Sequence, residues 1–124
     1  MRLLTDTNMY GSNFPKKRYK HTLKFFKRHI SPTDTILDLG VANPFSEILK
    51  HEGFTIRNTS GEDLDVDTST LDADTSDVVT AFEIFEHLLS PFTVLKSIKS
   101  KKLVASIPLR LWFASAYRSK TDPR

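Results

Sequence analysis

The apolar positions of this chain alternate between the spacing of a helix and that of a strand. In residues 15–30, apolar side chains recur at i, i+4, i+7 and i+11, which is one face of an α-helix. Short apolar runs predict strands at 35–39, 54–58, 77–82 and 103–107, and segments that begin with proline predict helices at 44–50 and 91–98. The segment 62–67 is compatible with one more short strand. Strands that alternate with helices are typical of an α/β fold with a mostly parallel sheet between layers of helices.

The carboxyl ends of parallel strands meet at one edge of a sheet. Ligands bind at that edge, close to the point where the order of the strands reverses. This rule places four segments around one crevice, namely residues 38–43, 58–60, 62–67 and 82–87. We expect the binding residues of the protein among them.

The turn after the first predicted strand has the composition of a ligand-binding turn. Asp38 closes the apolar run, Gly40 permits a close approach that a Cβ would prevent, and Pro44 suits the first turn of a helix. Free N–H groups at the start of such a helix favour an electron-rich ligand. A plain strand-to-helix turn explains the same residues. The NAD fingerprint needs three glycines at this turn, and the chain has one of them.

Two segments of the chain resemble the class I S-adenosylmethionine (SAM)-dependent methyltransferases of type 11. Residues 37–44 read LDLGVANP where this family often reads LDxGxGxG, so that Ala42 and Pro44 replace two glycines. Residues 77–88 read DVVTAFEIFEHL where the family often reads FDxV followed by ExxEHL. The resemblance covers residues 33–108. It implies a Rossmann-like three-layer sandwich that binds SAM and transfers a methyl group to an acceptor that the sequence does not identify.

The resemblance assigns roles to three residues of the first segment. It implies that Asp38 holds the ammonium group of the methionine moiety of SAM, directly or through water. It also implies that Gly40 and Ala42 line the turn where the backbone passes the cofactor. An aspartate that only caps a nearby turn is the alternative for Asp38.

The ribose and methionine contacts are assigned in the same way. Asn58 and Thr59 stand where an acid usually pairs with the ribose hydroxyls, so their hydrogen bonds would lack the assistance of a charge. Glu62 is close enough in sequence to substitute, and plain turn residues are an alternative. The resemblance implies that Phe82 and Glu83 flank the methionine end of the cofactor.

The adenine contact and the catalytic base each have alternatives. Asp65 lies twelve residues before Asp77 and is implied to meet the exocyclic amine of adenine, with Asp63 and Asp67 as rivals in the same acidic loop. His87 either acts as a general base near neutral pH or fixes its loop through hydrogen bonds. Methyl transfer from a sulfonium depends mainly on proximity and alignment, so activity does not require a base.

Charge is distributed unevenly along the chain. Lysine and arginine crowd the predicted N-terminal helix and return from residue 96 onward, whereas residues 62–77 hold seven acids and no base. A basic face can bind nucleic acid or an acidic substrate. A solvated helix face balanced by the acidic segment explains the same pattern. The four histidines form no ligand set, so no metal site is expected.

We expect a single domain in residues 1–124. It comprises a basic helical segment at 1–32, a SAM-binding core at 33–108 and a tail at 109–124. A complete class I methyltransferase domain usually has seven strands, so this one is expected to be truncated after the fifth. An open sheet edge invites association, and the tail is rich in large apolar residues such as Trp112. We therefore expect the chain either to form a homodimer through the C-terminal edge or to be poorly soluble.

Other features of the chain narrow the class of protein. It has no cysteine, which excludes disulfides and thiolate sites. It has no apolar run long enough for a membrane span and no apolar segment typical of a signal peptide, so a cytoplasmic location is expected. A SAM-dependent methyltransferase is the leading interpretation. The alternatives are a non-catalytic SAM-binding remnant or subunit, an NAD binder, and a basic nucleic-acid-binding module.

Overall fold

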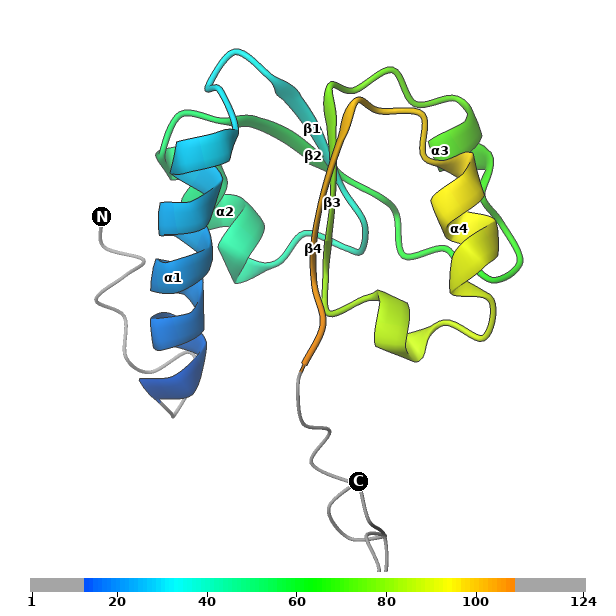
Figure 1. Ribbon diagram of the computed structural model, residues 1–124, viewed down its shortest axis with the longest axis horizontal. Coiled ribbons are helices and arrows are strands. Elements are labelled where there is room, and N and C mark those ends of the chain that lie inside the picture. Colours follow the sequence, from blue (N-terminus) through cyan, green and yellow to red (C-terminus); the bar gives the residue numbers. More distant parts are fainter. Residues whose placement is uncertain (1–12, 109–124) are drawn as a thin grey trace, which may run out of the picture.

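Four parallel strands form the sheet of the part of the chain that the structure describes. The computed structural model describes residues 13–108, with side chains from residue 16 onward. The strands are β1 (Thr35–Asp38), β2 (Thr55–Asn58), β3 (Val78–Phe82) and β4 (Lys102–Ser106), and their order across the sheet is β2-β1-β3-β4 (Figure 1). All neighbouring strands are parallel. The predicted α/β fold with a parallel sheet is thereby confirmed.

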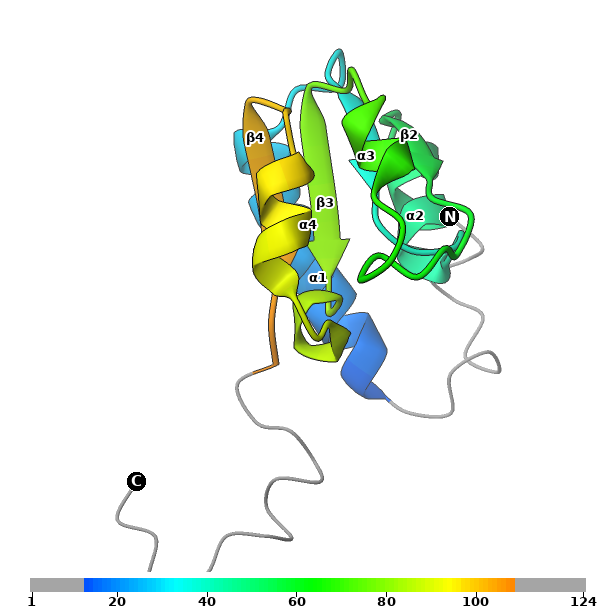
Figure 2. The ribbon, with the colours of Figure 1, turned by 90° about the vertical axis from the view of Figure 1, so that its right-hand side faces the viewer.

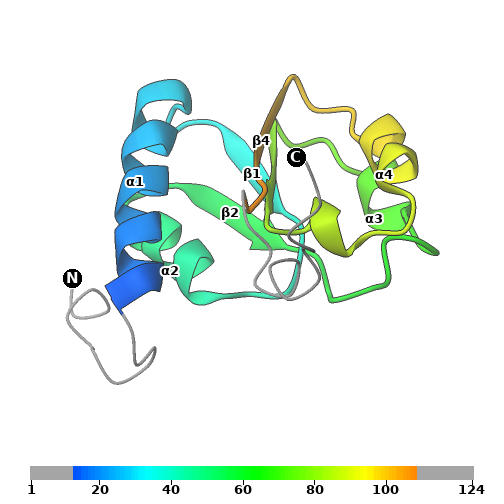
Figure 3. The ribbon, with the colours of Figure 1, turned by 60° about the horizontal axis from the view of Figure 1, so that its bottom comes forward.

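Helices cover both faces of this sheet. Helices α1 (Asn13–His29) and α2 (Pro44–His51) lie on one face, and α3 (Ser69–Asp72) and α4 (Pro91–Ser97) lie on the other (Figures 1 and 3). A short 3₁₀ turn, η3 (Phe85–His87), follows the end of β3. These three layers are consistent with a Rossmann-like arrangement.

Alternate residues of the central strands enter two separate hydrophobic cores. Ile36 of β1 packs toward α1 and α2 with Phe26 and Phe54, whereas the next residue, Leu37, packs toward α3 and α4 with Val94. Strand β3 is covered on both faces and buries four of its five residues, which explains why its sequence is a continuous apolar run. The edge strands β2 and β4 contain no fully buried residue.

The order of the strands reverses at β1. The chain passes from β1 to β2 on one side and then returns to β3 on the other side, with β4 beyond it. The connections after β1 and β3 therefore leave the sheet in opposite directions. In open α/β sheets, ligands bind in the crevice that this divergence creates at the carboxyl ends of the strands. Figure 2 shows β3 and β4 ending at this edge.

The segment 62–67 does not form the additional strand that its sequence suggested. It is a turn in which the N–H groups of Val66 and Asp67 donate to the carbonyl oxygen of Asp63 (2.9 and 2.8 Å). Leu64 is its one buried apolar residue, so a strand here would gain little from packing, and local hydrogen bonds prevail. The described sheet consequently has four strands rather than five. Helix α3, just beyond this turn, was not predicted.

Residues 1–12 and 109–124 lie outside the described part of the chain. The apolar tail and the homodimer contact through it are predictions that fall on the second of these segments. Within residues 13–108, no helix combines the length and the apolar composition that a membrane span needs.

Candidate functional site

A buried carboxylate lies at the carboxyl end of β1. Asp38 is 2% exposed, and its neighbours in register are Asn58 on β2 and Thr80 on β3. Thr80 Oγ1 donates to Asp38 Oδ1 (2.6 Å), and Asn58 Nδ2 donates to Asp38 Oδ2 (2.9 Å). Asn43 Nδ2 adds a third hydrogen bond to Asp38 Oδ2 (3.2 Å). The pairing of three strands therefore surrounds this carboxylate with donors.

The surroundings of Asp38 change its protonation. Burial raises the pKa of the Asp38 carboxyl above its usual value of 3.8, because a charge is less stable away from water. The hydrogen bonds from Thr80, Asn43 and Asn58 stabilise the ionised form and oppose this rise only in part. With three side-chain donors already turned toward it, the carboxylate joins the ends of the strands, and little of it is accessible from outside.

The glycine turn after β1 is attached to the end of β2. Gly40 has a φ of +110°, which favours glycine. Its N–H donates to Thr59 Oγ1 (2.7 Å), and its carbonyl oxygen accepts from Asn58 Nδ2 (3.1 Å). Asn58 and Thr59 are predicted to meet the ribose, and in this structure their side chains hold the turn. Ala42 is exposed at the same turn.

Asn43 organises the start of α2, and sequence reasoning did not single it out. Its Oδ1 accepts the N–H groups of Phe45 and Ser46 (both 3.0 Å), while Ser46 Oγ accepts the N–H of Asn43 (2.9 Å). These reciprocal bonds form a capping box. An asparagine that precedes Pro44 and is followed by a serine three positions later was the signal that could have identified it.

The acidic loop after β2 is tied to the start of α4. The two carboxylate oxygens of Asp65 accept the backbone N–H groups of Leu89 (2.9 Å) and Ser90 (2.8 Å). Glu62 similarly accepts the N–H of Ser60 (2.8 Å). These acids therefore shape the loops around the crevice, and the contact of Asp65 with adenine stays a prediction.

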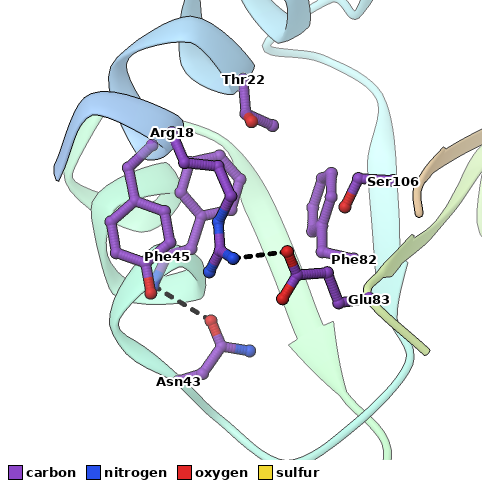
Figure 4. Close-up of a pocket in the computed structure, with 8 residues that line it drawn as sticks. Arg18, Thr22, Asn43, Phe45, Phe82, Glu83 and Ser106 are labelled. Atoms are coloured by element: carbon purple, nitrogen blue, oxygen red, sulfur yellow. Dashed lines mark hydrogen bonds and ion pairs between the residues drawn. The ribbon is translucent and has the colours of Figure 1, made fainter. Parts of the chain in front are cut away.

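A cavity of about 220 Å³ opens at the same edge, between α1, the start of α2 and the ends of β3 and β4 (Figure 4). Its walls combine aromatic rings with charged, amide and hydroxyl groups, from Arg18, Tyr19, Thr22, Asn43, Phe45, Phe82, Glu83 and Ser106. The ring of Phe45 stacks on Tyr19 (centroids 5.2 Å apart) and meets Phe82 edge to face (5.1 Å). The predicted residues Phe82 and Glu83 thus belong to one cavity, and Asn43 links it to the Asp38 carboxylate.

An ion pair crosses this cavity. Arg18 of α1 pairs with Glu83, which follows β3, and Figure 4 shows the two charged groups pointing toward one another. Glu83 is the one non-glycine residue with a positive φ (+55°) in the described chain, and its N–H donates to the Ser106 carbonyl oxygen (2.9 Å). The Arg18 guanidinium also lies over the ring of Tyr19, 5.4 Å from its centroid. Sequence reasoning identified Glu83 but missed Arg18.

The η3 turn places its histidine outside the cavity. The side chain of His87 is 76% exposed, and its Nε2 lies 3.8 Å from Oε1 of Glu86. The side chain of Glu86 is only 9% exposed, and its Oε2 has no hydrogen-bond partner among the described residues. The buried group of this turn is therefore Glu86. Within the same described range, no three His, Asp or Glu side chains are grouped as metal ligands.

Comparisons with known proteins do not identify the chain. No protein-family model matches it, and neither the curated proteins nor the solved structures gave a significant match. The functional argument therefore rests on the sequence pattern and on the geometry of this site.

Proposed function

We propose that the chain binds SAM at the carboxyl edge of its sheet and acts as a class I methyltransferase domain. One observation carries this proposal. The two segments that resemble the family include the carboxyl ends of β1 and β3, which are neighbours in the sheet, and Asp38 is in register with Thr80 although they are 42 positions apart. If the resemblance were accidental, there would be no reason for the two segments to meet at the edge where such sheets bind ligands.

The size and lining of the cavity suit the methionine end of SAM. A cavity of about 150 Å³ holds one benzene molecule, so about 220 Å³ has room for an amino acid but not for a nucleoside as well. The adenosine part would extend along the exposed turn at Val41 and Ala42, whose N–H groups donate to no described residue. Such free N–H groups before a helix favour an electron-rich ligand. Because the side chains of Asn58 and Thr59 already bind the turn, Glu62 would take the contact with the ribose hydroxyls in this proposal.

The residues of the site would act on SAM by position. SAM supplies a methyl group on a positively charged sulfur, and transfer depends mainly on holding the acceptor in line with it. The rings of Tyr19, Phe45 and Phe82 would exclude water from the methionine end, and Glu83 would place a negative charge close to it. In this proposal His87 is not needed as a base, which is in keeping with its exposed position.

Specific observations support two alternatives to this proposal. A non-catalytic SAM-binding subunit would have the same edge and the same cavity, because nothing in the described residues defines an acceptor site. A basic nucleic-acid-binding module is supported by the exposed side chains of Lys17, Lys20 and Lys24 on α1.

An NAD binder is disfavoured, because Ala42 and Pro44 lack the backbone freedom of the fingerprint glycines.

Calorimetric titration of the 124-residue chain with SAM, S-adenosylhomocysteine and NAD tests the proposal. We expect saturable binding of SAM and S-adenosylhomocysteine, and none of NAD. Binding of NAD alone, or of none of the three, would contradict the proposal. If SAM binds, incubation with methyl-labelled SAM and a panel of acceptors distinguishes an enzyme from a non-catalytic subunit.

A further inference from the structure

Two side chains of opposite charge face one another inside the cavity. Arg18 and Glu83 both line it, and they belong to segments 65 positions apart. The side chains are 36% and 33% exposed, so each remains accessible to a ligand and to water. An ion pair exposed to this degree adds little to the stability of a fold. Separating the two partners therefore costs little, provided that each finds a new partner.

The backbone around Glu83 points to a role beyond this ion pair. A non-glycine residue with a positive φ is uncommon and is retained where the surrounding structure holds it, often at functional sites. Here the bond from the Glu83 N–H to the Ser106 carbonyl oxygen fixes the conformation. The result is that the carboxylate faces α1 across the cavity (Figure 4).

Asp38, the other acid at this edge, is poorly placed to bind a ligand ammonium group. It is almost fully buried, and Thr80, Asn43 and Asn58 already donate to it. Three of the roughly four lone-pair sites of the carboxylate are therefore occupied, and the residue is only 2% exposed, so an ammonium group has little access to it. Glu83 is more accessible, and it has to release only one side-chain partner, a long, partly exposed arginine on another element.

We propose that Arg18 and Glu83 together form a site for an α-amino acid group, in which each exchanges the other for one charge of the ligand. Arg18 would bind the carboxylate with two parallel N–H donors, and Glu83 would accept from the ammonium group. A zwitterion placed between them leaves no charge unpaired. This inference rests on the proposed function, in which the α-amino acid is the methionine moiety of SAM.

The surrounding groups favour a ligand of this shape. The rings of Tyr19, Phe45 and Phe82 provide an apolar wall for the aliphatic part of the amino acid. The volume of about 220 Å³ suits a ligand of amino acid size. Selectivity follows from the two charges, because a ligand that lacks either one leaves Arg18 or Glu83 without a new partner.

Calorimetry with two related ligands tests this inference. S-adenosylhomocysteine carries the α-amino acid, whereas 5′-methylthioadenosine has the same nucleoside and thioether without it. Both are titrated into the full chain and into the variants Arg18→Gln and Glu83→Gln. The matched control is Lys24→Gln, which removes an exposed charge from the same helix. Circular dichroism confirms that each variant is folded.

We expect each site variant to weaken binding of S-adenosylhomocysteine by about ten- to a hundredfold, the effect of one charged hydrogen bond. Binding of methylthioadenosine should stay unchanged, and Lys24→Gln should alter neither ligand. Unchanged binding of S-adenosylhomocysteine by both folded site variants would overturn the inference and leave the proposed function standing. Failure of the unmodified chain to bind either ligand would overturn both.

A second measurement needs no substitution. The unmodified chain is titrated with analogues of S-adenosylhomocysteine that lack only the carboxylate or only the amino group. Each should bind more weakly than S-adenosylhomocysteine by a similar factor. Equal affinity for all three ligands would contradict an exchange of charges at Arg18 and Glu83.

Discussion

Two acidic residues at the same edge of the sheet lie in very different surroundings. Asp38 is buried, accepts hydrogen bonds from three side chains, and has a pKa that burial raises. Glu83 is one third exposed, pairs with the single side chain of Arg18, and has a positive φ. Both follow or end central strands, and the family resemblance gives both a place near the methionine end of the cofactor.

This contrast is the basis on which we propose a structural role for one acid and a ligand-binding role for the other. Asp38 has three side-chain donors without any ligand, and neighbouring strands and the cap of α2 supply them. Glu83 has one weak, exposed partner and a backbone conformation that the protein must hold at some cost. We therefore place the structural role at Asp38 and the ligand-binding role at Glu83, and the following predictions test that division.

The largest effect is expected from Asp38→Ala. The substitution leaves the buried Thr80 hydroxyl without its acceptor, which costs about 1–3 kcal/mol. It also removes the charged partner of the Asn58 amide, which keeps its bond to the Gly40 carbonyl oxygen. We expect the free energy of unfolding to fall by about 3 kcal/mol, as measured by urea denaturation. Glu47→Ala is the control, because the side chain of Glu47 is 44% exposed, and it should change stability by less than about 0.5 kcal/mol. An Asp38→Ala variant as stable as this control would remove the distinction between the two acids.

Gly40→Ala should affect both stability and binding. An alanine at φ +110° is strained, at a cost of about 1–3 kcal/mol. The new Cβ would lie 3.5 Å from Cδ1 of Ile84, an ordinary contact, so the cost comes from the backbone. Gly53→Ala is the matched control, because Gly53 has φ +92°, a Cβ there would meet no atom within 4 Å, and the residue lies away from the candidate site. Both variants should lose stability, but only Gly40→Ala should bind S-adenosylhomocysteine more weakly in calorimetry.

The dependence of stability on pH should differ between Asp38 and the exposed Asp77. The pKa of Asp38 is raised above 3.8 in the folded protein. The part of the stability that is linked to its protonation is therefore fully present below the pKa of the unfolded chain, and it is lost as pH rises through the folded pKa. Hydrogen bonds from the N–H and hydroxyl of Thr35 lower the pKa of Asp77. The part of the stability that is linked to the ionisation of Asp77 is therefore present above the pKa of the unfolded chain, and it is lost as pH falls through the folded pKa. Carboxyl carbon shifts in an NMR titration should place the pKa of Asp38 above 3.8 and that of Asp77 below it. The reverse order would contradict this assignment.

The smallest effect on stability is expected from Glu83→Gly. Removing a partly exposed ion pair costs about 0.2–1 kcal/mol, and glycine relieves a left-handed conformation that costs other residues about 1–2 kcal/mol. The two changes oppose each other, so the free energy of unfolding should stay within about 1 kcal/mol of the unmodified value. A loss of more than twice that amount in urea denaturation would show that Glu83 is a structural residue.

The strands, and the edge at which their carboxyl ends meet, could be predicted because their signals are local. Apolar runs bounded by turn residues mark β1 and β3, and parallel pairing then brings their carboxyl ends together. The turn at 62–67 was misread because apolar residues alternate with acids there, as in a strand. The carbonyl oxygen of Asp63 instead accepts two backbone N–H groups of the turn, an outcome that the period of the pattern does not reveal.

The partners of the site residues could not be predicted from the same signals. Arg18 is one of many basic residues on α1, and only the docking of that helix on the sheet selects it as the partner of Glu83. Asn58 and Thr59 were recognised as residues at a strand end. Whether their side chains point toward a ligand or toward the turn at Gly40 depends on contacts across two strands.

Amide chemical-shift mapping tests the central claim, that SAM binds at the carboxyl edge of the sheet, most directly. S-adenosylhomocysteine is added to the ¹⁵N-labelled chain, and the shift of each assigned amide is followed. We expect saturable changes at Ala42 and Glu83 and little change at Thr55 and Asp77, which lie at the opposite edge. No change at saturating ligand, or changes confined to the opposite edge, would contradict the account.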